Sequence, residues 1–150
     1  MPWVAITEAD VVKVLAGPEL DSYRSAALED GQADPVAPAI DAVTQEIHGY
    51  VQACARNVLG PDGTIPSRLL DCALALLAVR IPARVGRDPR PVRKDAAAAA
   101  LAQLKDVAAC KFMVDPPAPD LPPSTEPSSA PSPHISNTGA IAGKQRFDGL

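Results

Sequence analysis

The residue types able to perform acid–base or nucleophilic chemistry are few in this chain and lie far apart. Neither of its two histidines, His48 and His134, has a serine or cysteine at the spacing of a nucleophile and its base. The stretch Gly60-Pro-Asp-Gly63 is typical of a turn, and it lacks the Lys and Ser/Thr of a phosphate-binding loop. Carboxylate pairs such as Glu8 with Asp10 have no matching ligands elsewhere in the sequence. We therefore expect a binding or structural protein and not an enzyme, with no metal and no cofactor.

The three cysteines predict free thiols. Cys54, Cys72 and Cys110 are odd in number, far apart, and form no Cys-x-x-Cys pair. This spacing predicts neither a disulfide framework nor a zinc site. Each cysteine falls among Ala, Leu and Val in a separate expected helix, so we expect buried thiols that pack as small apolar side chains.

The most concentrated chemical feature is a basic segment, residues 80–94. It has a net charge of +5, whereas residues 1–79 have a net charge of −7. Two interpretations stay open. The segment is either a solvated helix end whose cations complement the helix dipole, or a surface that meets an acidic face of another chain or DNA phosphate. The candidate interface residues are Arg80, Arg84, Arg87, Arg90 and Arg93.

Helices must position these residues, because apolar side chains recur at steps of three and four without an alternating strand pattern. The spacing of Thr7 and Asp10 is that of a capping box, which opens a short helix. Gly17-Pro18 ends this helix and starts a second one that reaches about Leu28. Asp34-Pro35 then predicts the start of a longer amphipathic helix.

Two further helices follow the turn at residues 60–63. The first begins at Pro66 or Ser67 and is apolar on nearly every face, so we expect it at the centre of a bundle or buried by other subunits. Pro82 is expected to disrupt its end. The last helix opens at Pro91 or Val92, and its alanine run permits close contact with another helix.

The expected core includes a glycine. Gly49 lies inside the long amphipathic helix, where it costs about 1 kcal/mol relative to Ala, so we expect a neighbouring backbone to approach it closely. The predicted core residues are Ile40, Ile47, Gly49, Tyr50, Leu70, Leu74, Leu77, Leu101 and Leu104.

These patterns predict an all-α fold, a small bundle of four to five helices with an extended Pro-rich C-terminal arm. The helical domain is expected at residues 1–114 and a Pro/Ser-rich linker at residues 115–133. A C-terminal docking peptide follows at residues 134–150, where large apolar side chains return. The expected docking residues are Ile135, Ile141, Arg146, Phe147 and Leu150.

Composition excludes several classes of partner. Five aromatic residues among 150 are too few for a base-stacking nucleic-acid surface. No apolar run approaches the length of a membrane span, and acids stand at the N-terminus where a signal peptide has positive charge. We therefore expect a soluble protein made inside a cell, without a membrane partner.

Several motifs also occur in an informative order. Trp3-Val-Ala-Ile-Thr7-Glu-Ala-Asp10 is followed by Asp41-Ala-Val-Thr-Gln-Glu46-Ile-His-Gly49-Tyr50, and Arg56 comes shortly after. Ile65-Pro-Ser-Arg-Leu-Leu leads the next helix. Leu104-Lys-Asp-Val-Ala-Ala-Cys110-Lys111 ends the last helix, and Gln145-Arg-Phe-Asp-Gly-Leu150 ends the chain. In this order the chain resembles the phage head–tail connector (adaptor) proteins of the Mu-like family, which have Gly where this chain has Cys110.

The resemblance implies a structural virion protein of the phage neck, assembled in the bacterial host cytoplasm. It implies a dodecameric ring under the portal protein, joined on its other side to a stopper or tail terminator protein. DNA would pass through the channel with non-specific contacts, and C-terminal arms would reach the portal or a neighbouring subunit. The −7 and +5 segments suit a ring, because its head-to-tail contacts join different faces of one chain.

Two other functions remain possible from the sequence. The basic segment at residues 80–94 also fits a small helical DNA-binding regulator, although the isoelectric point near 5.0 opposes this. A tail-assembly chaperone that is absent from the finished virion would have the same sequence features as a connector.

Overall fold

The computed structural model describes residues 2–119, and it is mostly helical, as the sequence predicts. Five α-helices form the bundle: α1 (Glu8–Val14), α2 (Gly17–Glu29), α3 (Val36–Ala53), α4 (Leu70–Arg84) and α5 (Pro91–Ala108). Two short strands, β1 (Trp3–Ala5) and β2 (Thr64–Pro66), and a 3₁₀ turn, η1 (Ser67–Leu69), complete it. The predicted linker beyond residue 119 and the docking peptide at residues 134–150 lie outside the described residues.

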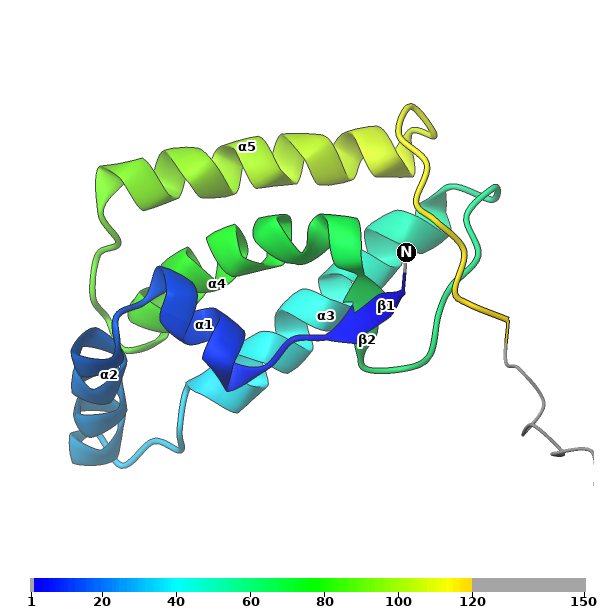
Figure 1. Cartoon of the computed structure of the whole chain (residues 1–150). Coiled ribbons are helices and arrows are strands. Elements are labelled where there is room, and N and C mark those ends of the chain that lie inside the picture. Colours follow the sequence, from blue (N-terminus) through cyan, green and yellow to red (C-terminus); the bar gives the residue numbers. More distant parts are fainter. Residues whose placement is uncertain (1, 120–150) are drawn as a thin grey trace, which may run out of the picture. The chain divides into compact units, whose positions relative to one another are not determined.

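The central element is α4, which packs against α1, α3 and α5 (Figure 1). Eight of its fifteen residues are buried, including Leu74, Leu77 and Ile81. The sequence left open whether other subunits bury this helix. The bundle itself does so, because α4 has a neighbouring helix on three sides. Pro82 is buried within the helix, which continues to Arg84 instead of ending at the proline.

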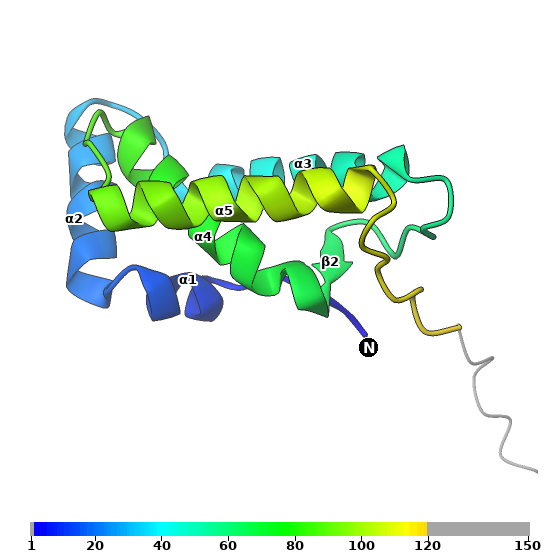
Figure 2. The same ribbon diagram turned by 90° about the horizontal axis from the view of Figure 1, so that it is seen from above.

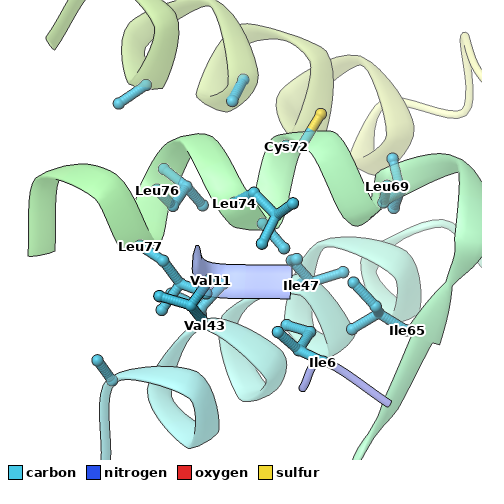
Figure 3. Close-up of a cluster of buried hydrophobic side chains, with 14 of the residues drawn as sticks. Ile6, Val11, Val43, Ile47, Ile65, Leu69, Cys72, Leu74, Leu76 and Leu77 are labelled. Atoms are coloured by element: carbon cyan, nitrogen blue, oxygen red, sulfur yellow. The ribbon is translucent and has the colours of Figure 1, made fainter. Parts of the chain in front are cut away.

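The core lies where α4 faces α1 and α3. Figure 3 shows Val11, Val43, Ile47, Leu74 and Leu77 gathered there, and Leu77, Val43 and Ile47 have no exposed surface. Eight of the nine predicted core residues are buried in this cluster or packed against it. They are Leu77 and Ile40, Ile47, Tyr50, Leu70, Leu74, Leu101 and Leu104.

Gly49 is the exception, and its predicted role in the core is wrong. Its position is exposed, and a Cβ built there would meet nothing within 4 Å. Within residues 2–119, therefore, no backbone approaches Gly49 closely. The prediction failed because a glycine in an amphipathic helix does not by itself show which face it occupies.

The two strands are a second departure from prediction. β1 and β2 pair antiparallel, with Trp3 opposite Pro66, Val4 opposite Ile65, and Ala5 opposite Thr64. Each strand has three residues, too few to show an alternating pattern. The ribbon ties the N-terminus to the residues that precede α4 (Figure 1).

The helix starts follow local chemistry. The capping box of α1 is confirmed: the Thr7 side chain accepts from the Asp10 backbone N–H, and the Asp10 carboxylate accepts from the Thr7 backbone N–H. α3 begins at Val36, one residue beyond Pro35, and the Asp34 carboxylate accepts from the Val36 N–H at 2.9 Å.

Three helices end in the same hydrogen-bonded turn. After α2 and α4, Gly31 and Gly86 have φ of 71° and 70°. After α5 the equivalent residue is Cys110, with φ of 58°, and the Lys111 N–H bonds to the Asp106 carbonyl. The tight helix end that the resemblance associates with Gly therefore forms here with a cysteine.

The prediction of three free thiols is wrong for two of them. Cys54 and Cys110 form a disulfide, with their Cα atoms 5.3 Å apart. α3 and α5 pack together, and the two cysteines follow the last residues of these helices, so residues 56 positions apart in sequence meet at one end of the bundle. The spacing of the cysteines in the sequence does not show that Cys54 and Cys110 lie next to each other in the fold. Cys72 is a buried free thiol, as predicted.

Candidate interaction surface

The basic segment spans the end of α4, the following loop and the first turn of α5, and the views in Figures 1 and 2 place it beside α2. Pro91 at the start of α5 and Gly86 after α4 set the two ends of the loop. The segment therefore faces the acidic N-terminal part of the same chain, and this arrangement decides what its arginines can do.

A two-pronged ion pair joins α5 to α2. The Arg93 guanidinium donates to both carboxylate oxygens of Glu19, at 2.6 and 2.8 Å, and also to the Val14 carbonyl at 3.3 Å. The Tyr23 hydroxyl donates to the same carboxylate at 2.6 Å. Both side chains of the ion pair are less than a quarter exposed. Such a two-pronged, partly desolvated pair is stronger than a typical surface ion pair.

This geometry shifts the pKa values of the cluster. Hydrogen bonds from Arg93 lower the pKa of Glu19 from 4.5 to about 2, and the hydrogen bond from Tyr23 adds to the effect. The pKa of Arg93 is raised, chiefly by its bonds to Glu19. Burial raises the pKa of Tyr23, and the neighbouring Glu19 carboxylate raises it further.

The Glu19–Arg93 ion pair should make the free energy of unfolding depend on pH in the acidic range. Because the pKa of Glu19 is lower in the fold than in the unfolded chain, its stabilisation is complete above pH 4.5 and is lost as the pH falls toward 2. We expect Glu19→Gln to lower the free energy of unfolding by about 1–2 kcal/mol at pH 6. Urea denaturation at pH 6, 4, 3 and 2.5 measures this difference, which should shrink toward zero at the lowest pH.

A neighbouring glutamate is the control for this prediction. Glu29 at the end of α2 is exposed and has no ion-pair partner within residues 2–119. Glu29→Gln should change the free energy of unfolding little at any of these pH values. A Glu19→Gln effect of equal size at pH 6 and pH 2.5 would show that the pair does not act through its charge.

Other basic residues are also held within the chain. The Arg80 guanidinium pairs with Glu46 on α3, and Lys94 pairs with Asp88 at 2.7 Å. Arg87 donates to the Ser22 hydroxyl at 2.9 Å, and its guanidinium lies 5.6 Å from the centre of the Tyr23 ring. The +5 and −7 segments thus neutralise each other in part within one subunit.

Three of the predicted interface arginines lie outside the internal ion pairs. Arg84, Arg87 and Arg90 are exposed, and Arg84 and Arg90 have no ion-pair partner within residues 2–119. Arg80 and Arg93 are paired internally and Arg87 contacts Ser22 and Tyr23, so a contact with another chain through this segment depends mainly on Arg84 and Arg90. The sequence did not identify Glu19 and Glu46 as partners. The only available signal was the opposite charge of the two segments.

A shallow apolar hollow lies beside this basic end, where α1, α4 and α5 meet. Its volume is about 320 Å³, and among its lining residues are Val14, Ala75, Val92 and Ala96. Val92 is 79 % exposed, the highest value among the large exposed hydrophobic residues. Asp71, which has no ion-pair partner in the described part of the chain, lines both this hollow and a second one that continues along α4 and α5 toward Gln103.

A separate hollow lies between α3 and α5 and includes Gly49. Its volume is about 420 Å³, and its other lining residues are Glu46, Tyr50, Ala53 and Ala108. These three hollows are places where the described bundle exposes small and apolar residues. The arm residues Ile135, Ile141, Arg146, Phe147 and Leu150 lie outside the described residues.

The open position of Gly49 gives a direct prediction. Gly49→Ala should raise the free energy of unfolding by about 0.5–1 kcal/mol, because Ala favours the helix and its Cβ meets nothing within 4 Å. Thermal unfolding followed by circular dichroism measures the change. A loss of stability would show that the position is more crowded than the fold indicates.

Metal-binding side chains do not cluster in the described part of the chain. Across residues 2–119, no group of three or more His, Cys, Asp or Glu side chains is arranged to hold a metal ion. No helix in this part of the chain has the length and hydrophobicity to cross a membrane. His48, in α3, packs edge-on against the Trp3 ring and contacts the Thr64 carbonyl. The His48 side chain therefore packs α3 against both strands of the β-ribbon.

The class that these features define is a small helical bundle with a two-stranded ribbon at one end and a partly neutralised basic loop at the other. A scan against protein-family models, a search of curated proteins and a search of solved structures each found no match to this chain.

Proposed function

We propose that this chain is a non-enzymatic structural protein of a tailed-phage neck, a head–tail connector. It would form a ring under the portal, join the DNA-filled head to the tail, and let DNA pass through its channel. Its partners would be further copies of itself, in a dodecamer, the portal protein, and a stopper or tail terminator protein. It would be assembled in the bacterial cytoplasm and retained in the virion.

The observation that carries this proposal is the order of the motifs from Trp3 to Leu150, which resembles the Mu-like connector family. The surfaces of the bundle are compatible with it. A ring needs two different faces on each subunit, and the exposed arginines at the basic end lie apart from the Gly49 hollow in sequence and on different elements. Charge complementarity between subunits would mainly set their register and encounter rate.

The direct test is the mass of the purified chain, alone and with the portal protein of the same phage, by native mass spectrometry. A monomer that forms a closed ring on the portal supports the connector. A chain that never joins the portal under these conditions would contradict it. Detection of the chain in purified virions separates a connector from an assembly chaperone.

The C-terminal region provides a genetic prediction. Deleting residues 134–150 should leave the helical bundle folded, as judged by circular dichroism, and should reduce incorporation into heads at least tenfold. The matched control replaces the same 17 residues with a Gly/Ser segment, which keeps the length and removes the apolar and basic side chains. The control should behave like the deletion. Heads that fill and join tails normally without residues 134–150 would contradict the docking role.

A DNA-binding regulator is the second candidate, and the exposure of Arg84, Arg87 and Arg90 is the observation that favours it. Internal pairing of Arg80 and Arg93 opposes it, because fewer cations remain for phosphate. Tight duplex binding with a steep salt dependence would support the regulator. Absence of binding at low salt would dismiss it.

A further inference from the structure

The end of the bundle opposite the basic loop holds a short segment, residues 111–115, which we call the C-terminal strap. It lies between the β-ribbon and the loop after α3. The Trp3 indole N–H donates to the Asp115 carbonyl at 3.1 Å, and the Val114 N–H donates to the Asn57 side chain at 3.3 Å. Val114 is buried, with 5 % of its surface exposed. Arg68 forms an ion pair with Asp115 at 3.4 Å.

The disulfide stands at the beginning of this strap. Cys110 immediately precedes it, and Cys54 ends α3, three residues before Asn57. Asn57 is itself held to α3, since its side chain donates to the Val51 carbonyl and its backbone N–H donates to the Cys54 carbonyl. The covalent bond and the Asn57 contacts therefore connect the same two segments, the loop after α3 and the chain leaving α5.

Of the two disulfide cysteines, Cys110 has an unfavourable backbone conformation. Its φ of 58° is the only left-handed conformation of a non-glycine residue among the described residues, whereas α2 and α4 end with glycine at the same place in the turn. A residue with a Cβ disfavours this conformation. Loss of the disulfide removes one of the forces that hold Cys110 there, and the strap begins at the next residue.

We propose that the Cys54–Cys110 pair is a redox-operated latch that fixes the C-terminal strap to the bundle. Cys110 is half-buried and Cys54 is 1 % exposed, so we take the sulfur of Cys110, the more exposed residue, as the one that is attacked. A small-molecule thiolate such as glutathione attacks that sulfur, the bond to Cys54 breaks, and Cys54 leaves as a thiolate that takes up a proton. A second glutathione thiolate attacks the mixed disulfide, releasing Cys110 thiolate and oxidised glutathione. Closing the latch is the reverse sequence, with oxidised glutathione accepting the two electrons.

The latch makes the state of the strap depend on the redox conditions of the compartment in which the protein lies. Reducing cytoplasm keeps most thiols reduced, whereas disulfides persist outside the cell. On the connector proposal, the strap would be loose in the cytoplasm where the protein is assembled and fixed once the virion has left the cell. The latch itself does not depend on the connector proposal, since it concerns only the purified chain and a thiol buffer.

The first test uses the full chain, purified in the oxidised state, and hydrogen exchange followed by mass spectrometry. Reduction with glutathione should raise the exchange rate of peptides that cover residues 111–115 at least tenfold and bring it close to that of an unfolded chain. Peptides from α4 lose the protection that corresponds to the lower global stability, but they should still exchange far more slowly than an unfolded chain. Trp3 is the only tryptophan, so its fluorescence should change in the same titration. Equal protection of the strap in both states would overturn the proposal. Exchange of α4 peptides at the rate of an unfolded chain would overturn it too, because the disulfide would then maintain the whole fold.

The second test relies on the reciprocity of coupled equilibria. If closing the disulfide favours the docked strap by a given factor, then docking of the strap favours the disulfide by the same factor, and a chain whose strap no longer docks loses that factor. Asn57→Ala removes the Val114 contact, so we expect the glutathione equilibrium of the chain to shift about fivefold toward the dithiol. Glu29→Gln at the end of α2, which touches neither segment, is the control and should leave the equilibrium unchanged. An unchanged equilibrium in Asn57→Ala would show that disulfide and strap are independent, and would overturn the latch.

Discussion

Reduction of the Cys54–Cys110 disulfide is expected to lower the free energy of unfolding by about 4 kcal/mol at 25 °C. The bond joins residues 56 positions apart, so it restricts more than a third of the chain in the unfolded state. Urea denaturation with and without a reductant measures the effect. Cys72, a buried free thiol in the folded protein, is replaced by alanine in both samples so that it cannot exchange with the disulfide once the chain unfolds.

Two variants separate the cross-link from the backbone conformation at Cys110. Both lack the disulfide: one has Cys54→Ser with Cys110→Ser, and the other has Cys54→Ser with Cys110→Gly. Glycine adopts a positive φ without penalty, so the second variant should be more stable than the first by about 1 kcal/mol. Equal stability of the two variants would mean that Cys110 leaves the left-handed conformation once the bond is absent. A midpoint of denaturation unaffected by reductant would contradict the expected loss of about 4 kcal/mol.

Replacement of Gly60 by Ala is expected to destabilise the fold by about 2–3 kcal/mol. A Cβ at this position would lie 2.3 Å from Cδ2 of Trp3, and two further atoms of the same ring lie within 2.7 Å. The indole cannot rotate away freely, since its N–H bonds to the Asp115 carbonyl and its ring meets the His48 ring edge-on. The added methyl group would therefore force the β-ribbon and Trp3 away from the loop after α3.

The matched control is Gly17→Ala at the start of α2, where a Cβ meets nothing within 4 Å. This variant should change the free energy of unfolding by less than about 1 kcal/mol. Thermal denaturation compares the two variants, and Trp3 fluorescence reports the displacement of the indole in Gly60→Ala. A Gly60→Ala protein as stable as the native chain, with unchanged Trp3 emission, would show that the contact has room to relax.

The net charges of two segments predicted that opposite charges would meet, but not whether they would meet within one chain or between chains. The segments with net charges of −7 and +5 were visible in the sequence, and complementary faces on neighbouring subunits were one interpretation. Within the chain, Glu19 binds Arg93 and Glu46 binds Arg80. Opposite charges in a single chain can neutralise each other once the fold brings α2 and α3 beside the basic segment. The proposed subunit contacts therefore depend on the arginines that remain exposed.

The sequence by itself determined the local elements of this protein. Helical periodicity, the Thr7–Asp10 capping box, and the prolines and glycines at helix ends all act within a few residues, so they predicted a bundle of four to five helices. They left open whether α4 is buried by the bundle or by other subunits. Tertiary structure alone decided which distant residues meet. It joined Cys54 to Cys110, paired β1 with β2, placed Gly49 on an open surface, and set Trp3 against Gly60. The physical reason is that these contacts depend on the relative placement of whole helices, which no short-range pattern in the sequence encodes.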